Sequence, residues 1–268
     1  MNMGKRIISG IVIIGLLVAM LVLQEVYLKV GVVLIGLFCQ YEMLYTIRQS
    51  GTKTMDLPVY LCALAMFPAY YYFGAEGVLF TYAITLMLLF MTRTLCSRYD
   101  YKSVAYSALS LLYPQLFMVF FYKIVCIEDA HASLMMIVLS IVAASSSDTF
   151  AYFVGKAMGK RKLCPAISPN KTVEGAIGGL LGGTVLTGVA ALIFGETAIP
   201  LYGYFLLGAL LAALSQFGDL ASSLTKRFFG VKDFGKLIPG HGGMLDRVCS
   251  IIFVLPVTLL FFRIFYGI

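Results

Sequence analysis

Long apolar runs follow one another along nearly the whole chain, and this feature restricts its fold more than any other. A membrane-spanning helix needs about 20 apolar residues. Runs of roughly that length cover residues 7–23, 30–47, 57–73, 77–92, 104–122, 134–154, 173–194, 201–223 and 245–265. The chain is 60% hydrophobic and 12% charged, which excludes a soluble domain. Continuous runs also exclude an outer-membrane barrel. We therefore expect an all-α polytopic membrane protein with about nine transmembrane helices.

Two features of the sequence could indicate a cleaved signal peptide and a disulfide-bonded or zinc-binding protein, and we reject both interpretations. The basic and then apolar start is similar to a signal peptide, but no small-residue cleavage pattern follows it, so we interpret residues 7–23 as a retained span. The six cysteines show no paired or metal-like spacing and mostly lie in or beside apolar runs. We therefore expect them to be buried side chains and not disulfides or zinc ligands.

The basic residues indicate the orientation in the membrane. When alternate loops are assigned to one side, only Lys29, Lys123 and Arg263 fall on the other side, which leaves 17 of the 20 basic residues together. This bias predicts that the 17 and the N-terminus are cytoplasmic. The longest basic loops, 155–172 and 224–244, share that side. We expect an N-terminal region of about five spans (1–133) and a C-terminal catalytic region (134–268) that contains both loops.

Acidic residues inside membrane spans are costly and are therefore functional candidates. Five lie in or beside the predicted spans: Glu42, Asp148, Glu174, Asp219 and Asp246. The last four flank the two basic loops, so we expect them at the cytoplasmic face. For Glu42 we favour a structural role, in which it reaches toward the headgroups or pairs with a cation of a neighbouring helix. Arg48, six residues on, does not share its helix face.

Carboxylates beside many cations suit phosphate chemistry. Mg²⁺ takes oxygen ligands and binds substrate phosphates, while Lys and Arg neutralise polyanions. Together they favour phosphoryl or nucleotidyl transfer. The segment Pro239–Gly243, "PGHGG", is either an ordinary turn or a place where backbone N–H groups approach a phosphate. Gly175, Gly179 and Gly183 recur every four residues, which predicts a close helix-packing face.

The stretch "SLTKRFFGVKDFGKLIPGHGGMLDRV" resembles the signature of phosphatidate cytidylyltransferases (CDP-diacylglycerol synthases). Its pattern is S-x-hydrophobic-K-R, K-D-x-small, P-x-H-G-G and D-R-x-D. The segments "SDTFAYFVGKAMGKRKL", "ISPNKTVEGAIGG" and "QFGDLASS" are similar to further blocks of that family. The blocks cover about residues 145–250, and the upstream spans fit by topology only.

The resemblance implies site residues for the present chain. Asp219 and Asp246 would be the metal carboxylates, for Mg²⁺ with a monovalent cation beside it. The implied catalytic residues are Asp219, Asp246, Lys226, Arg227 and His241. The implied substrate-binding residues are Asp148, Ser168, Lys171, Glu174, Ser223, Lys232, Asp233, Gly242, Gly243 and Arg247, with Lys171 the best candidate for a CTP phosphate.

The resemblance also implies a reaction in which phosphatidate attacks the α-phosphorus of CTP, giving CDP-diacylglycerol and pyrophosphate for phospholipid biosynthesis. The expected partners are CTP, phosphatidic acid, the bilayer and a second copy of the chain, without nucleic acid. A chain of nine spans without extra domains suggests a bacterial plasma membrane, with the active site facing the cytoplasm.

Three positions depart from the pattern. Thr225 replaces a hydrophobic residue, with little expected effect. Asn170 stands where the family usually has Lys or Arg. Cys249 replaces the second Asp of D-R-x-D, three residues after Asp246 and on the same helix face. A thiol is a poor Mg²⁺ ligand, so we expect weakened or altered metal binding unless that Asp acts only indirectly.

Three alternatives stay open from the sequence. The first is a CTP-dependent kinase of a polyprenyl or phytyl alcohol, which would release lipid phosphate and CDP. The second is a transporter, against which the acids cluster at one face and not at the midplane. The third is a catalytically impaired lipid-binding relative, for which Cys249 is the argument.

Overall fold

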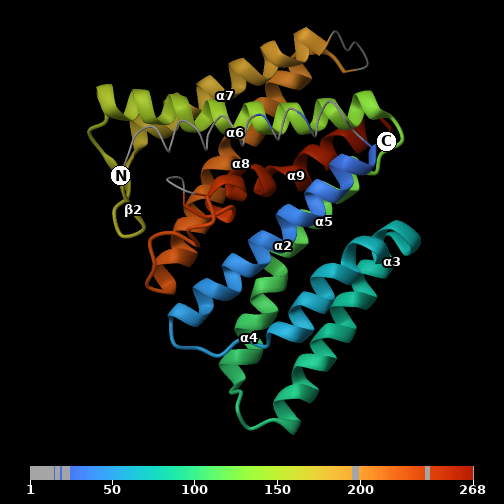
Figure 1. Cartoon of the computed structure of the whole chain (residues 1–268). Coiled ribbons are helices and arrows are strands. Elements are labelled where there is room, and N and C mark those ends of the chain that lie inside the picture. The colour runs from blue at the N-terminus through green and yellow to red at the C-terminus, as the bar shows by residue number, and fades with distance from the viewer. Residues whose placement is uncertain (1–14, 16–18, 20–24, 195–198, 239–241, 268) are drawn as a thin grey trace. The chain divides into compact units, whose positions relative to one another are not determined.

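The computed structural model describes residues 25–194, 199–238 and 242–267, and residues 15 and 19 besides. Helices dominate this part of the chain, as expected, and one small two-stranded ribbon interrupts them (Figure 1). In order the elements are α2 (Glu25–Gln49), α3 (Asp56–Leu95), α4 (Tyr101–Ser110), the π-helical turn η1 (Leu111–Gln115), α5 (Leu116–Val125), α6 (Ala130–Met158), β1 (Lys162–Cys164), β2 (Ser168–Thr172), α7 (Val173–Phe194), α8 (Leu201–Phe228) and α9 (Leu245–Phe265).

In the described residues, seven helical segments are long and apolar enough to cross a membrane, where the sequence predicts about nine. The predicted span 7–23 lies almost entirely outside the described residues. The predicted spans 57–73 and 77–92 belong to the single helix α3. Gly74 breaks α3 with φ 61° and ψ −143°, a conformation open to glycine. Its two arms fold back along each other (Figure 1). At about 1.5 Å of rise per residue, each arm is long enough to cross roughly one membrane thickness.

The chain packs as two compact units that are interleaved in sequence. Unit 1 comprises residues 1–126 and 228–248, and unit 2 comprises residues 127–227 and 249–268. The segment 228–248, which carries much of the signature, therefore packs with the N-terminal helices. The division predicted from the sequence separates N-terminal spans (1–133) from a catalytic region (134–268), and it stays a prediction.

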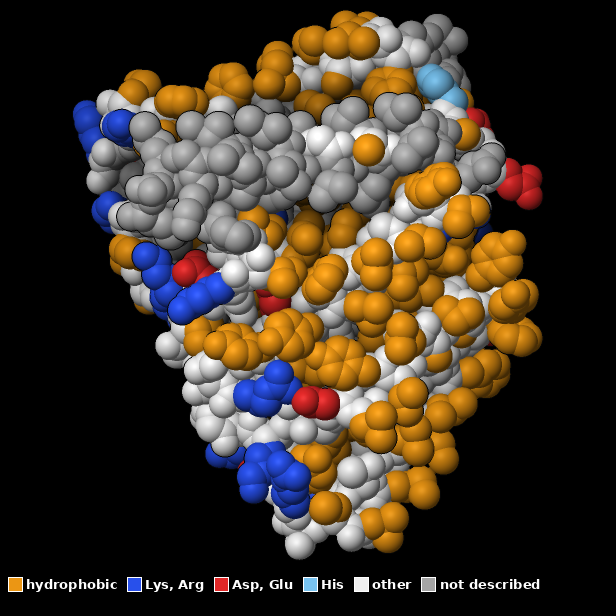
Figure 2. All heavy atoms as spheres, in the orientation of Figure 1, with side chains coloured by type: hydrophobic (Ala, Val, Ile, Leu, Met, Phe, Trp, Pro, Cys, Tyr) orange, Lys and Arg blue, Asp and Glu red, His pale blue; other side chains and the backbone are white. Residues whose placement is uncertain are grey.

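Unit 1 has a buried core between α2, α3 and the α4–α5 stretch. Leu44, Met66 and Leu89 are fully buried in it. The outer face of α3 is exposed, and Tyr72 and Phe73 on it are more than 70% exposed. Figure 2 shows hydrophobic side chains covering this outer face. A large exposed apolar surface of this kind suits contact with lipid.

Basic side chains gather at one end of unit 1. Lys53, from the loop after α2, lines one cavity together with Arg93 near the end of α3, Arg98 in the loop after α3 and Lys102 in the first turn of α4. Both loops therefore lie at the same end, as the alternation of loops predicts. That this end faces the cytoplasm stays a prediction.

Unit 2 depends on close approach of α7 to α6. A Cβ added to Gly175 would lie 2.7 Å from the carbonyl oxygen of Ala151, and one added to Gly179 would lie 2.7 Å from that of Ser147. Gly183 continues this face and packs against α6 and α8. The predicted packing face is therefore confirmed. Because it is used inside unit 2, it is not available for the expected assembly of two chains.

The predicted burial of the cysteines is confirmed for three of the six. Cys39, Cys62 and Cys249 are buried, and the other three are partly buried. No disulfide links any of them within the described residues.

Candidate active site

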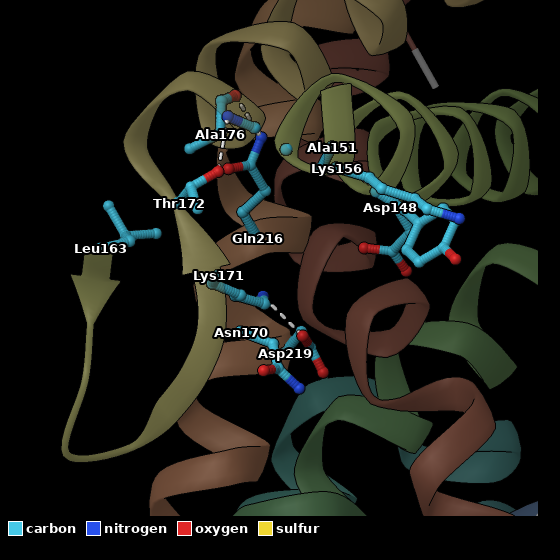
Figure 3. Close-up of a pocket in the computed structure, with 13 residues that line it drawn as sticks. Asp148, Ala151, Lys156, Leu163, Asn170, Lys171, Thr172, Ala176, Gln216 and Asp219 are labelled. Carbon is cyan, nitrogen blue, oxygen red and sulfur yellow. Dashed lines mark hydrogen bonds and ion pairs between the residues drawn. The ribbon is translucent and has the colours of Figure 1, made fainter. Parts of the chain in front are cut away.

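A pocket of about 420 Å³ opens in unit 2, lined by α6, the ribbon, α7 and α8 (Figure 3). Three of the predicted site residues, Asp148, Lys171 and Asp219, meet in it. The full lining is Asp148, Ala151, Tyr152, Gly155, Lys156, Leu163, Asn170, Lys171, Thr172, Gly175, Ala176, Gln216 and Asp219. The fold therefore joins residues from three of the four sequence blocks in the lining of one cavity.

Lys171 and Asp219 form an ion pair in this pocket. Nζ of Lys171 lies 2.5 Å from Oδ2 of Asp219, and the two side chains are 26% and 32% exposed. Figure 3 shows them reaching toward each other from β2 and α8. Partial removal from water strengthens such a pair relative to one on an open surface. The sequence predicts that both residues share a membrane face, but it does not predict that they pair.

The backbone of Lys171 is held through its neighbour, Thr172. Thr172, the next residue, pairs with Lys162 across the ribbon. Its Oγ1 also accepts a hydrogen bond from the N–H of Gly175 at 3.1 Å, so Thr172 caps the N-terminus of α7. Lys171 thus lies between a strand pair and a capped helix, and this arrangement fixes where its side chain enters the pocket.

Gln216 holds α8 in place one turn before Asp219. Its Nε2 donates to Oγ of Ser147 and to the carbonyl oxygen of Ala176, both at 3.1 Å. These bonds tie α8 to α6 and to α7. Residues three apart share a helix face, so Asp219 is directed into the same pocket.

Three of the residues that line the pocket carry oxygen donors of the kind that a hard cation prefers. Asp148 and Asp219 supply carboxylate oxygens, and Asn170 supplies an amide oxygen. In the described part of the chain, no three His, Cys, Asp or Glu side chains lie close enough to hold a metal ion on their own. Mg²⁺ does not need such a cage, because it commonly binds one or two carboxylates together with waters and substrate phosphates. The donor chemistry therefore fits Mg²⁺.

The second group of predicted residues belongs to the signature segment, which we define as residues 231–248 in unit 1. The N–H of Ile238 donates to the carbonyl oxygen of Gly242 at 2.9 Å. His241, with the two residues before it, lies outside the described residues.

Asp246 organises the end of the signature segment. It lies in the first turn of α9, and its Oδ2 accepts hydrogen bonds from the N–H of Phe234 at 2.9 Å and from the N–H of Gly243 at 3.1 Å. The Gly243 amide, which the sequence offers as a phosphate contact, is therefore bonded to a carboxylate of the protein. The direction of the Asp246 carboxylate is fixed by these two bonds.

Glu42 plays a different part from the one expected. It is only 1% exposed, and its two oxygens accept hydrogen bonds from the N–H groups of Met244 and Leu245 at 2.9 and 2.8 Å. Arg48 instead pairs with Asp56 at 2.6 Å. The expectation that Glu42 reaches the headgroups or pairs with a cation is therefore wrong. The favoured structural role for Glu42 is correct, because its bonds hold the start of α9.

Comparison with known proteins decides the family. A family model described as the cytidylyltransferase family matches residues 4–265. The chain belongs to the cytidylyltransferase family. A curated protein of Bacillus subtilis (strain 168), named phosphatidate cytidylyltransferase, is 34% identical over 263 residues, which cover 95% of this chain and 96% of the relative. A protein of the same name from Thermotoga maritima is 34% identical over 221 residues, 78% of each chain.

The other site residues that the cytidylyltransferase resemblance implies are distributed over both units. Ser168, Glu174, Ser223, Lys226 and Arg227 belong to unit 2, outside the lining of the pocket. Lys232, Asp233, Gly242, Gly243 and Arg247 belong to unit 1 with Asp246. Their assignments to nucleotide and lipid stay predictions.

Among these cytidylyltransferase residues, Glu174 has a clear local task. Its carboxylate accepts hydrogen bonds from the N–H groups of Lys160 and Arg161, at 3.0 and 3.2 Å to Oε2. It thereby ties the entry of the ribbon to the first turn of α7. The sequence raised the alternative that Glu174 is a first-turn acid on the helix dipole, and its place outside the pocket favours a structural role.

Two residues of the pocket are not among those that the sequence predicts. Lys156 is a second cation in the lining, and Gln216 ties three helices together. Both lie in the blocks "SDTFAYFVGKAMGKRKL" and "SQFGDLASS", one or two helical turns from a predicted acid. Helical spacing from Asp148 and Asp219 was therefore the available signal.

Cys249, the departure from the cytidylyltransferase pattern, is 2% exposed. It lies in α9, where its carbonyl oxygen would be 3.1 Å from a Cβ added to Gly218. A glycine before Asp219 therefore lets α8 and α9 approach closely. The thiol is part of a tightly packed stretch, so any group at position 249 must be accommodated in little space.

Proposed function

We propose that the chain is a phosphatidate cytidylyltransferase, which transfers CMP from CTP to phosphatidic acid and releases pyrophosphate. The observation that carries the proposal is the pocket that joins Lys171, Asp219 and Asp148 in a chain that matches the family over nearly its whole length. Relatives that align with most of the chain bear this name.

The reaction does not require a strong general base. An oxygen of the phosphatidate phosphate forms a bond to the α-phosphorus of CTP, and the bond from that phosphorus to the bridging oxygen of pyrophosphate breaks. A phosphate monoester has a second pKa near 6 and is largely a dianion at neutral pH. The nucleophile therefore needs no deprotonation, and the protein has to neutralise charge and align the reacting groups.

The cations of the pocket supply part of that neutralisation. Lys171 is paired with Asp219 in the described structure, and Lys156 lines the same cavity. When a triphosphate enters, the ammonium of Lys171 can exchange the Asp219 carboxylate for phosphate oxygen. Lys226, Arg227 and Lys232 of the resembling blocks are proposed to contact phosphates of CTP or lipid.

Mg²⁺ is the proposed cofactor, with Asp219 and Asp246 as its carboxylates. Bound Mg²⁺ would polarise phosphate oxygens and neutralise the developing charge on pyrophosphate. The exchange of Lys171 described above would release Asp219 for this role. The accompanying monovalent cation stays an expectation from the family resemblance.

The proposed setting is the cytoplasmic face of a bacterial plasma membrane. Its support is the asymmetry of basic residues and the grouping of Lys53, Arg93, Arg98 and Lys102 at one end of unit 1. CTP is a cytoplasmic nucleotide, and phosphatidate is a bilayer lipid, so the reaction requires a site where the two meet. A homodimer is proposed as the assembly.

The test is turnover by the detergent-purified chain of labelled CTP with phosphatidate and Mg²⁺, followed by product analysis. CDP-diacylglycerol and pyrophosphate, lost in Asp219→Asn, are the expected products. Lipid phosphate and CDP would instead indicate the lipid kinase. No product from folded protein would contradict both enzyme readings and favour the lipid-binding relative.

A further inference from the structure

Glu42 is a carboxylate buried in a predicted membrane span, and the proposed reaction gives it no task. A buried acid in a span is costly unless its oxygens are satisfied. Here both oxygens accept backbone N–H groups, those of Met244 and Leu245, at the start of α9. The first N–H groups of a helix have no partner inside the helix, so Glu42 supplies from another helix what a capping residue usually supplies locally.

Glu42 and Asp246 divide one short stretch of backbone between them. The N–H groups of Gly243, Met244 and Leu245 are consecutive, and the first donates to Asp246 while the other two donate to Glu42. The turn that leads into α9 is therefore clasped by two carboxylates, one from α2 and one from its own first helical turn. Moving this turn would change the direction of Asp246.

Phe234, earlier in the signature segment, joins the same arrangement. The N–H of Phe234 donates to Asp246 at 2.9 Å, and its carbonyl oxygen accepts a hydrogen bond from Oγ1 of Thr46 at 3.2 Å. Thr46 lies one turn after Glu42 on α2. Phe234 is fully buried. The segment is thus attached to α2 at two successive turns.

Two glycines, Gly235 and Gly243, lie so close to the Glu42 carboxylate that a side chain does not fit there. A Cβ added to Gly235 would lie 2.6 Å from Oε1 of Glu42, and one added to Gly243 would lie 2.5 Å from Oε2. These distances are shorter than any normal contact. The small residue that follows K-D-x in the signature is therefore required by the space that Glu42 occupies.

We propose that Glu42 is a positioning residue for the reaction, which acts through the signature segment to fix the Asp246 carboxylate. This inference rests on the proposed function, because it takes Asp246 as a group that handles Mg²⁺ or substrate. Partners that orient a metal ligand typically change metal affinity or activity by about 10- to 100-fold when they are removed. Unlike such partners, Glu42 acts on Asp246 indirectly, through the backbone amides of Met244 and Leu245.

The test compares the full-length parent with Glu42→Gln and with a matched control, Gln40→Met. Gln40 is a fully buried residue of the same helix, and it donates to Oγ of Ser110 at 2.9 Å, away from the signature segment. Glu42→Gln replaces one acceptor oxygen by an NH₂ group, which cannot accept a backbone N–H. Both variants lose buried hydrogen bonding in α2, but only one loses contact with α9.

Two measurements are made below the unfolding temperature of every variant. One is hydrogen exchange of the amides in residues 231–248, and the other is kcat and KM for CTP as a function of Mg²⁺ concentration. We expect Glu42→Gln to accelerate exchange at Met244 and Leu245 at least about tenfold. We also expect the Mg²⁺ concentration for half-maximal activity to rise, or kcat/KM to fall, by about 10- to 100-fold. Gln40→Met should change neither.

A second variant, Gly235→Ala, approaches the same carboxylate from the other side and keeps the test decisive if Glu42→Gln does not fold. It should reproduce the kinetic defect, and in the double variant the two effects should not add. Normal kinetics and Mg²⁺ dependence in folded Glu42→Gln or Gly235→Ala would overturn the inference, even with faster exchange. A parent that makes no CDP-diacylglycerol would instead refute the proposed function, while accelerated exchange would still establish the anchor.

Discussion

The ammonium of Lys171 lies 2.5 Å from the Asp219 carboxylate, and this pair joins the only ribbon of the described chain to helix α8. Each group thus neutralises the other in a partly buried pocket. If the ammonium of Lys171 moves to a phosphate of CTP during the reaction, a variant without Lys171 binds CTP more weakly, while the Asp219 carboxylate loses its partner.

We expect Lys171→Met to lower kcat/KM for CTP by about 100-fold, because a cation that meets developing phosphate charge is lost. Lys171→Arg should recover only part of this activity, since the guanidinium has a different shape. Lys162→Met is the control, because Lys162 is an exposed cation of the same ribbon that does not line the pocket. Steady-state kinetics in detergent measure all three. Equal losses in Lys171→Met and Lys162→Met would point to a general effect of charge.

The approach of α7 to α6 should be sensitive to a single methyl group. Gly179→Ala would place a Cβ 2.7 Å from the carbonyl oxygen of Ser147 and 3.0 Å from Nε2 of Gln216. We expect a loss of about 1–3 kcal/mol in the free energy of unfolding, as for other overpacked sites, measured by thermal unfolding in detergent. Leu181→Ala, at a position 61% exposed on the same helix, should have little effect. An unchanged Tm for Gly179→Ala would contradict the close packing.

Cys249→Asp restores the residue that the family pattern has one turn after Asp246. We expect the Mg²⁺ concentration for half-maximal activity to fall several-fold, since a carboxylate is a better Mg²⁺ ligand than a thiol. We also expect Tm to fall, because position 249 is 2% exposed and burial of a charge is costly. Cys249→Ser controls for loss of the thiol. An Mg²⁺ dependence shared by all three proteins would place position 249 outside the metal site.

Asp100 caps α4, and its titration should contribute to the pH dependence of stability. The N–H and the hydroxyl of Ser103, each 2.8 Å from Oδ1, hold the pKa of Asp100 below its usual value. A lowered pKa in the folded state gives stability that is present above about pH 4 and is lost as the pH falls through the folded value. Asp100→Asn keeps an acceptor but does not titrate. Tm should therefore fall less steeply with acidification in Asp100→Asn than in the parent, and parallel curves would refute this.

The membrane helices were predictable because their signal is length and apolarity, which do not depend on distant contacts. The boundary between the predicted spans 57–73 and 77–92 coincides with the break at Gly74. The ribbon of β1 and β2 was not predicted, since a short pairing within the loop 155–172 leaves no alternating pattern in the sequence.

The site was predictable in its composition but not in its pairings. The sequence brings Asp148, Lys171 and Asp219 to one face by topology, and the described structure joins them in a pocket. That Lys171 meets Asp219 depends on how α8 crosses the ribbon, which the sequence does not encode locally. Glu42 was misjudged for the same reason, because its partners are 202 and 203 residues away.

The bond between residue 42 and residue 244 also has a consequence for biosynthesis. A ribosome adds about 5–20 residues per second, so Glu42 enters the membrane roughly 10–40 seconds before its partners are made. During that interval its carboxylate needs temporary solvation, by water, by lipid headgroups or by the insertion machinery. The segment 228–248, made late in synthesis, therefore completes unit 1. A nascent chain that stops before Met244 retains an acid in the membrane without its donors.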